Sequence, residues 1–460
     1  MQPEDDLSRL AGMAQRFAEA RNWLSISGAV NEVFPSHFRV EGLSPFLRLD
    51  DCVLLEGAPG ISYGQAIRIG RDGALVKSFE SNAGVGLGSR VRHVGPIEVA
   101  PCLAWKGRVI DALARPIDDR GALMQGDARR RLESAPPKPM SRARIETPAP
   151  TGVRAIDAFT PLCKGQRVGV FAGSGVGKST LLAMMSRSAA FDAVVICLVG
   201  ERGREVRDFI DDALGPKASN AVTIVATGDE SPMMRRMAPL TATAIAECFR
   251  DAGASVLLIM DSVTRYAHAL REIALAAGEP PAANGFAPSV FADLPRLLER
   301  TGPGPAGAGA ITAIYSVLVD GDDHNDPIAD CIRGALDGHI VLDRGIAEQG
   351  RFPAIDVLKS VSRLADRVFR PGEREIVSAM RGLIAQYEDT KDLRLLGGYQ
   401  PGADPALDCA VDAAPKLYRL LIQAPDAPVS ADPIAELLPA IGAAVGASPA
   451  QALATNAGAL

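Results

Sequence analysis

The sequence predicts an α/β protein, in which a parallel sheet follows a small β-barrel and precedes a group of helices. Between residues 150 and 368, short apolar runs such as 194–199 and 256–260 alternate with helix-like segments, and such runs suit strands buried on both faces of a parallel sheet. Residues 25–97 hold short β-like runs separated by Gly, Asn, Asp and Pro, which is typical of an all-β barrel or sandwich. Beyond Pro371 the pattern is helical to about residue 422.

These patterns divide the chain into four expected segments: 1–24, 25–97, 98–370 and 371–460. The first is expected to be an amphipathic helix, because Leu7, Leu10, Met13 and Phe17 recur at helical spacing. The second is the β-barrel domain, the third the sheet domain and the fourth the helical domain. Inside the sheet domain, the Gly- and Pro-rich stretch 301–307 predicts a flexible surface loop.

The composition limits the class of protein. The chain has 460 residues and a net charge of −6, so the molecule as a whole does not favour nucleic acid or an anionic membrane, although a local basic channel stays possible. Its seven cysteines are scattered and include no C-x-x-C pair, which indicates a reducing compartment and argues against a disulfide framework or a zinc site. No signal-peptide pattern opens the sequence, and no apolar run reaches the ~18 residues of a membrane helix.

The stretch 171–180, FAGSGVGKST, interrupts a strand-like run and opens a helix-like one, which is the context of a phosphate-binding loop. Glycines there let backbone N–H groups surround an anion, and the helix that follows adds its positive end. The first glycine of the usual motif is Ala172, which is acceptable if its φ is negative. The alternative is a glycine-rich turn that binds nothing. The residues predicted to bind a nucleotide are Gly173, Ser174, Gly175, Val176, Gly177, Lys178, Ser179 and Thr180.

Two acidic residues follow apolar runs and are expected at the same sheet edge as this loop. Glu201 comes after the run 194–199, and Asp261 comes directly after 256–260. A carboxylate in such a place can hold Mg²⁺ through water or polarise an attacking water molecule. The alternatives are a helix N-cap for Asp261 and a surface ion pair with a nearby arginine for Glu201. A phosphoryl-transfer site also benefits from an added arginine, but spacing alone does not distinguish Arg363 from the other arginines.

Taken together, these motifs resemble the rotary-type ATPases, and among them the flagellum-specific ATPases of the flagellar export apparatus, with the type III secretion ATPases beside them. The resemblance covers nearly the whole chain and implies a RecA-like P-loop ATPase core. The stretches that carry it include GRVIDALARPID (107–118), VGERGREVRDFI (199–210), VLVDGDDHNDPIAD (317–330), LDGHIVLDRGIAEQGRFPAIDVLKSVSR (336–363) and LGGYQPGAD (396–404). Ala112 and Ala114 depart from the pattern, because glycines are usual at both positions.

The resemblance implies a role for five of the residues near the phosphates. Lys178 contacts the β- and γ-phosphates, and Ser179 binds magnesium. Glu201 is the catalytic carboxylate, supported by Arg202, and Asp261 is the second acid on the magnesium side.

The resemblance also implies three contacts further along the chain. Arg363 is the arginine finger that reaches the nucleotide of a neighbouring subunit. Phe352 stacks on adenine, and its alternative role is that of a core phenylalanine. Tyr399 and Gln400 lie near the adenine pocket, unless Tyr399 is an ordinary loop residue.

The function implied is hydrolysis of ATP with Mg²⁺, coupled to export of flagellar proteins by a homohexameric ring. The implied partners are a dimeric regulatory protein that binds the N-terminal helix, a central stalk protein, membrane proteins of the export gate, and export substrates with their chaperones, but no nucleic acid. The implied location is cytoplasmic, at the periphery of the inner-membrane export apparatus. Virulence-type secretion, a non-catalytic ring subunit and a nucleic-acid translocase are the alternatives. Glu201 argues against the second, whose members usually carry Gln there, and the few aromatic residues of 25–97 argue against the third.

Overall fold

The computed structural model describes residues 25–56, 62–80, 84–319 and 326–442, so the helix predicted over 1–24 lies outside the described residues. The chain forms two compact units. Among the described residues, the first unit holds those up to Ile97 together with Ala276–Gly278, and the second holds the others. Within the described ranges, no helix combines the length and apolar character needed to cross a membrane.

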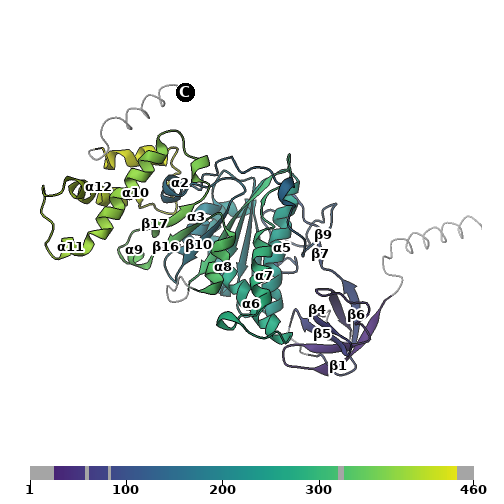
Figure 1. Cartoon of the computed structure of the whole chain (residues 1–460). Helices are drawn as coiled ribbons and strands as arrows, with labels where there is room; N and C mark the ends of the chain where they lie inside the picture. Colours follow the sequence, from purple (N-terminus) through teal and green to yellow (C-terminus); the bar gives the residue numbers. More distant parts are fainter. Residues whose placement is uncertain (1–24, 57–61, 81–83, 320–325, 443–460) are drawn as a thin grey trace, which may run out of the picture. The chain divides into compact units, whose positions relative to one another are not determined.

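The first unit is a closed antiparallel barrel, which decides between the two all-β folds that the sequence allowed (Figure 1). Its strand order is β1-β2-β5-β4-β3-β6. Buried and exposed positions alternate along β2, and the barrel core contains Phe38, Val40 and Val53. The strands are β1 (Ser27–Val33), β2 (Phe38–Glu41), β3 (Cys52–Glu56), β4 (Ser62–Gly70), β5 (Gly73–Ser78) and β6 (Arg90–Gly95).

A mainly parallel sheet forms the centre of the second unit, with strand order β17-β16-β10-β15-β13-β11-β12-β8. All neighbouring pairs on this path are parallel except β16 and β17. Every residue of β11 and β12 is buried, as the uninterrupted apolar runs predicted. The strands are β8 (Val109–Asp111), β10 (Arg167–Ala172), β11 (Ala193–Val199), β12 (Ala221–Ala226), β13 (Ser255–Asp261), β15 (Ala310–Leu318), β16 (Gly338–Leu342) and β17 (Ile355–Ser362).

Helices connect these strands, and the long helix α5 packs on β11, β12 and β13 (Figure 1). Ser231 caps α5 by accepting a hydrogen bond from the amide of Met234, and Pro232 occupies the first turn, where no amide donor is needed. The helices of this part are α2 (Arg154–Phe159), α3 (Lys178–Ser186), α4 (Gly203–Asp208), α5 (Pro232–Asp251), α6 (Val263–Ala276), α7 (Pro288–Leu298), α8 (Pro327–Ala335) and α9 (Arg344–Glu348). Two short strands, β7 (Glu98–Val99) and β9 (Arg130–Arg131), pair with each other.

The prediction of a flexible surface loop over 301–307 is wrong for the first half of this stretch. Residues 301–304 are buried, and β14 (Gly302–Pro303) pairs with β15. The hydroxyl groups of Thr301 and Tyr315 lie 3.0 Å apart inside the core. A Cβ atom on Gly304 would lie 2.8 Å from the Cβ of Ala308, so this glycine permits close packing rather than flexibility. Only 305–307 are exposed.

The C-terminal part is helical, as predicted, and the last long helix ends at Leu421 (Figure 1). Its helices are α10 (Glu373–Asp389), α11 (Lys391–Leu395), α12 (Pro405–Leu421) and α13 (Pro433–Leu437). Apolar residues at helical spacing on α10, such as Ile376 and Met380, join Ala414 and Leu417 of α12 in the same core cluster as the sheet. The C-terminal helices and the sheet therefore share one hydrophobic core.

Candidate active site

The predicted phosphate loop connects β10 to α3, which is the arrangement that the motif requires. Gly175 and Gly177 have φ angles of +80° and +91°, in the left-handed region that glycine adopts without strain. Ala172 has no positive φ, so an alanine is accommodated at the first motif position. The loop can therefore turn as a phosphate-binding loop does, despite its one departure from the motif.

Packing fixes one side of this loop and leaves the other side open. Val176 is 2% exposed and anchors the loop in the core, together with Leu181 and Leu182 of α3. Ser174, Ser179 and Thr180 are exposed. The first turn of a helix has unpaired N–H groups and a partial positive charge, so the open side is suited to an anion.

The sheet brings both predicted acids, Glu201 and Asp261, close to Lys178, the first residue of α3. Asp261 ends β13, and Glu201 follows the neighbouring strand β11, where Leu198 is in register with Asp261. The Nζ of Lys178 lies 2.5 Å from Oδ1 of Asp261 and 3.8 Å from Oε1 of Glu201. Asp261 is only 2% exposed, so its negative charge depends on Lys178 for compensation.

Burial, together with the nearby charge of Asp261, raises the pKa of Glu201 to about 7, and Lys178 opposes this shift. A carboxyl group with a pKa near neutrality can take up and release a proton under physiological conditions. The backbone around it is fixed, because Gly228 donates to the carbonyl of Glu201 and Gly200 donates to the carbonyl of Ala226. The site therefore holds an acid with a shifted pKa beside a lysine and an open anion-binding loop.

Neither alternative reading of the two acids matches the geometry. The helix that follows Asp261 begins with a hydrogen bond from the amide of Arg265 to the hydroxyl oxygen of Ser262, so Asp261 is not its cap. The ion pair of Glu201 is with Lys178, not with an arginine.

Sequence reasoning missed Arg265, whose side chain lies across Gly200. A Cβ atom on Gly200 would lie 2.8 to 3.0 Å from Cγ, Cβ and Cδ of Arg265, and Gly200 itself has a φ of +72°. The arginine is therefore next to the residue that precedes Glu201. Its position four residues after Asp261, in the first turn of α6, is the signal that could have identified it.

Two of the predicted residues lie on the surface of this single chain. The side chain of Arg202 is 87% exposed and pairs with Glu205 at 3.7 Å, not with Glu201. Arg363 directly follows β17 and is exposed, and its side chain makes no hydrogen bond or ion pair with the described residues. Neither arginine is brought to the Lys178 cluster by the fold of one chain.

Tyr399 and Gln400 also lie away from the phosphate loop. They belong to the loop between α11 and α12, at the end of the C-terminal helices most distant from α3 (Figure 1). The hydroxyl of Tyr399 donates to Asp408, which fixes this residue to α12. The resemblance placed these residues near adenine, but the length of α10 and α12 separates them from the site.

Phe352, in contrast, lies beside the phosphate loop. A Cβ atom on Gly177 would lie 3.6 Å from the ring of Phe352, and this phenylalanine is 45% exposed, so it is not an ordinary core residue. The carbonyl of Phe352 accepts a hydrogen bond from the amide of Gln423, just beyond α12. An exposed ring next to the loop offers a face on which a base can stack.

A cavity of about 380 Å³ opens on the exposed side of α3. Its lining includes polar groups of the helix start and apolar groups suited to a nucleoside. The lining residues are Ser179, Thr180, Ala183, Met184, Arg187, Glu205, Asp208, Phe209 and Pro425. Pro425 and Arg187 were not singled out from the sequence, since nothing in either local pattern indicates that the C-terminal segment reaches α3.

The donor set suits magnesium bound together with phosphates rather than alone. Ser179 and Asp261 supply the hydroxyl and carboxylate oxygens that Mg²⁺ prefers. Across the described ranges, no group of three or more His, Cys, Asp or Glu side chains could hold a metal ion. Magnesium characteristically binds one or two protein oxygens and completes its shell with water and substrate phosphate, so these residues fit it.

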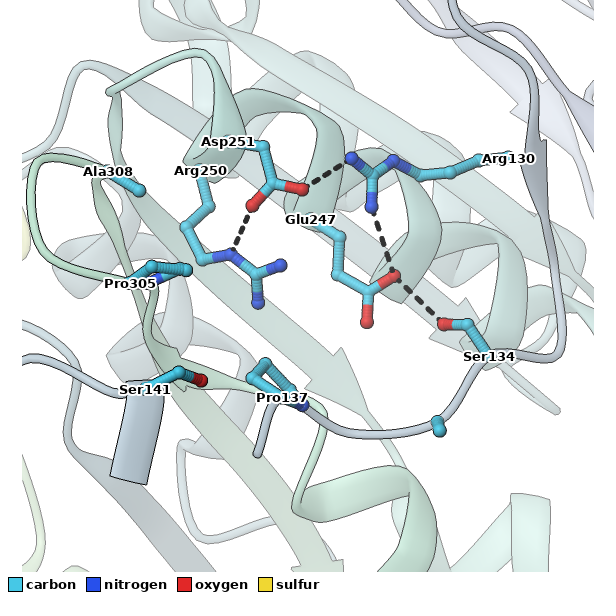
Figure 2. A pocket seen from close by; sticks show the side chains of 10 residues that line it. Arg130, Ser134, Pro137, Ser141, Glu247, Arg250, Asp251, Pro305 and Ala308 are labelled. Atoms are coloured by element: carbon cyan, nitrogen blue, oxygen red, sulfur yellow. Dashed lines mark hydrogen bonds and ion pairs between the residues drawn. The ribbon is translucent and has the colours of Figure 1, made fainter. Parts of the chain in front are cut away.

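A second cavity, of about 480 Å³, lies at the opposite end of the strands, beside the C-terminal end of α5 (Figure 2). Its acids are already neutralised: Glu247 accepts two hydrogen bonds from the buried Arg300, and Asp251 accepts from Arg130 and Arg250. Ser134 also donates to Glu247. These contacts tie the connection that contains Arg130 and Ser134 to α5, so the cluster stabilises the fold rather than forming a second reactive centre.

Comparison with known proteins identifies the family of the chain. Residues 152–362 match the nucleotide-binding domain of the ATP synthase alpha/beta family, and 369–440 match the C-terminal domain of the EscN ATPase of type III secretion. The chain is 53% identical to the flagellum-specific ATP synthase of Agrobacterium fabrum, over 95% of this chain and 92% of that protein. It is 44% identical to the type 3 secretion system ATPase of Xanthomonas euvesicatoria, over 87% and 90% of the two chains.

A solved structure is similar over most of the chain. The assembled ATPase EscN of enteropathogenic E. coli has a TM-score of 0.84 and 40% identity, and the match covers 90% of this chain and all of that one. The fold and the phosphate loop thus define a P-loop nucleotidase with the nucleotide-binding domain of the ATP synthase alpha/beta type. Within that class, the chain belongs to the family of flagellum-specific ATP synthases.

Proposed function

We propose that this protein hydrolyses ATP to ADP and phosphate at the site around Lys178. The observation that carries this proposal is the meeting of Lys178, Glu201 and Asp261 at the open end of the phosphate loop. Lys178 pairs with the carboxylates of Asp261 and Glu201. A bound triphosphate would compete with both carboxylates for the lysine ammonium group. Movement of the Lys178 ammonium group towards the phosphates would free the carboxylate of Asp261. With Ser179, this carboxylate would hold Mg²⁺, and the ion would supply further neutralisation of the phosphate charge.

Glu201 acts as the base in this proposal. With a pKa of about 7, it accepts a proton from the attacking water at neutral pH. Asp261 raises this pKa and Lys178 lowers it. Movement of Lys178 onto a phosphate therefore changes the proton affinity of Glu201 when the nucleotide binds. Arg265, whose aliphatic atoms lie across Gly200, adds positive charge near Glu201 in this proposal.

Arg363 completes a neighbouring site rather than its own. Its exposed side chain has no hydrogen bond or ion pair among the described residues, which suits a group that acts across a subunit interface. The related EscN has been solved in an assembled form and in complex with its central stalk EscO. We therefore infer a homohexameric ring with a stalk protein as partner.

The ring is proposed to serve export of flagellar proteins, at the cytoplasmic side of the inner membrane. Two flagellum-specific relatives, of Agrobacterium fabrum and Rhizobium meliloti, are 53% and 52% identical over 95% of the chain, and the secretion ATPase of Xanthomonas is 44% identical over 87%. The higher identity of these two favours flagellar over virulence-type export. A dimeric regulator, export-gate proteins, and chaperones with their substrates are the further partners proposed.

The decisive experiment is the rate of phosphate release as a function of protein concentration, with molecular mass recorded by light scattering. If Arg363 acts in trans, activity per chain rises steeply as the ring assembles. Constant activity per chain in a monomeric sample would refute the shared site. Absence of ATP hydrolysis in assembled wild-type protein would refute the enzymatic proposal itself.

A further inference from the structure

The segment that carries Phe352 is held by contacts with the C-terminal helices. Residues 350–354 connect α9 to β17 and belong to neither element. The ring of Phe352 is exposed, so its position depends on how the backbone on either side is fixed. The preceding residue, Arg351, provides this anchor through its side chain.

The guanidinium carbon of Arg351 lies 3.9 Å from the centroid of the Tyr418 ring, on α12. The Nε of Arg351 is buried and has no hydrogen-bond partner among the described residues. A guanidinium group this close to a ring is attracted by the negative face of its electron density. Arg351 therefore ties the Phe352 segment to α12.

Tyr418 is itself fixed by neighbours on α10. Its hydroxyl donates to Glu388 at 2.5 Å, and its ring meets that of Tyr387 edge to face, with centroids 6.1 Å apart. Burial raises the pKa of Tyr418, so the hydroxyl remains a donor at neutral pH. This ring cannot turn away from Arg351 without breaking its contacts with α10.

Arg394 contacts the ring of Tyr387, the neighbour of Tyr418 on α10. Its guanidinium carbon lies 3.6 Å from the centroid of the Tyr387 ring, and it donates to the carbonyl of Tyr387 at 2.6 Å. The Nε of Arg394, like that of Arg351, is buried without a hydrogen-bond partner in the described part of the chain. The four side chains form one continuous series of contacts, in which each arginine lies over a tyrosine ring and the two rings meet edge to face. We call this series the stacked cluster: Arg351, Tyr418, Tyr387 and Arg394.

We propose that the stacked cluster positions the ring of Phe352 over the phosphate loop and so sets the affinity of the site for the base of the nucleotide. The inference rests on the proposed function in that it requires a nucleotide at this loop. No residue of the cluster belongs to the phosphate loop or to the group around Lys178, so in this proposal its residues act through Phe352. Loss of the cluster should weaken binding of a nucleotide but not binding of a triphosphate chain that lacks a base.

The test compares two ligands by calorimetry: a non-hydrolysable ATP analogue with a β,γ-imido bridge, and inorganic tripolyphosphate, both with Mg²⁺. Arg351→Ala and Tyr418→Leu should each raise the dissociation constant of the analogue about 5–10-fold, and change that of tripolyphosphate less than about twofold. The double variant should be no weaker than either single one, because both changes remove the same contact. In steady-state kinetics, KM for ATP should rise while kcat changes little.

Arg271→Ala is the matched control. Arg271 stacks on Phe286 at 4.9 Å, so this variant loses the same kind of contact elsewhere, and it should bind both ligands as the wild type does. Tyr418→Phe keeps the ring and should retain affinity for the analogue. Where Arg351→Ala does not fold, Arg351→Lys, which keeps the charge and loses the planar group, replaces it.

Unchanged affinity of Arg351→Ala and Tyr418→Leu for the analogue would overturn the inference, and so would an equal loss for both ligands, since that would indicate general disruption. Wild-type protein that binds neither ligand would instead refute the proposed nucleotide site, and this inference with it. Ligand binding by the wild-type protein therefore distinguishes failure of the proposed nucleotide site from failure of this inference.

Discussion

Lys178 and Asp261 form an ion pair of 2.5 Å at the end of the central strands, although they are 83 residues apart in the sequence. The pair exists because β10 and β13 are parallel strands of one sheet, whose carboxyl ends lie at the same edge. Asp261 is nearly inaccessible to solvent, so Lys178, the residue proposed to contact the phosphates, also neutralises a buried charge.

Replacing Lys178 should therefore reduce both activity and stability. Lys178→Met removes the charge needed on the phosphates and leaves Asp261 buried without its partner, at a cost of about 3 kcal/mol in the free energy of unfolding. Adding Asp261→Asn should recover most of that stability and none of the ATPase activity. Denaturant unfolding and phosphate release on the three variants test this, and a double variant as unstable as Lys178→Met would contradict it.

Glu201→Gln should separate binding from turnover. The amide has nearly the same shape but cannot accept the proton of the attacking water, so kcat should fall by about 10²–10⁴-fold while the affinity for ATP is kept. Nucleotide binding and single-turnover hydrolysis provide the measurements. Near-normal kcat would mean that another acid, such as Glu205, is the base.

The raised pKa of Glu201 should also appear in the pH dependence of activity. Because the carboxylate form is the base, kcat/KM should rise with pH through about 7, the pKa of this group, and level off above it. A profile with no ionisation between pH 6 and pH 8, with chemistry rate-limiting, would be inconsistent with Glu201 as the base.

The same pKa makes a prediction for stability. The folded-state value of about 7 exceeds the ordinary value of 4.5, so protonated Glu201 favours the folded state. This contribution is complete below about pH 4.5 and is lost as pH rises through about 7. Glu201→Gln cannot ionise, so relative to the wild type it should gain about 1–2 kcal/mol between pH 5 and pH 8, allowing for solvent access to the site. A constant difference between the two proteins over this range would contradict the shift.

Mixed rings should reveal the role of Arg363. Lys178→Ala and Arg363→Ala are each expected to be inactive as homo-oligomers, because one lacks the phosphate charge and the other lacks the arginine across the interface. Mixing and reassembling them should restore part of the activity, since some interfaces then combine an intact loop with an intact arginine. Activity that stays at the level of the separate variants would show that both groups act within one chain.

The two alanines that replace usual glycines should respond in opposite ways to restoration of glycine. Ala114 has a φ of +59°, in a tight turn where its amide donates to the carbonyl of Asp111. Ala114→Gly relieves this strain and should raise the free energy of unfolding by about 0.5 kcal/mol, after the entropy that glycine adds to the unfolded chain.

Ala112→Gly is the matched change at a position without a positive φ. Ala112 is fully buried, so glycine there should lower the free energy of unfolding by about 1 kcal/mol through the lost methyl group and the added chain entropy. Thermal unfolding of the two variants measures the contrast, and an equal loss in both would show that the turn at Ala114 is unstrained.

The sequence by itself determined which segments form the buried strands and where the phosphate loop lies, because both depend on local patterns. Continuous apolar runs predicted the buried strands, and the pattern of Gly175, Gly177 and Lys178 predicted a phosphate loop that the glycine backbone angles fit. The fold class and the family are confirmed. The predicted domain boundaries, after residues 24, 97 and 370, stay a prediction. So does the helix over 1–24, which lies outside the described residues.

Only the tertiary structure decided which distant residues meet. Strand order, which no local pattern encodes, joined Lys178 to Asp261 and Glu201 and laid Arg265 across Gly200. The same holds for Phe352 beside Gly177, and for Tyr399, which the length of the C-terminal helices keeps away from the loop. Propensity and spacing act over a few residues of chain, whereas a site like this one depends on which strands become neighbours in the sheet and on how side chains then pack between them.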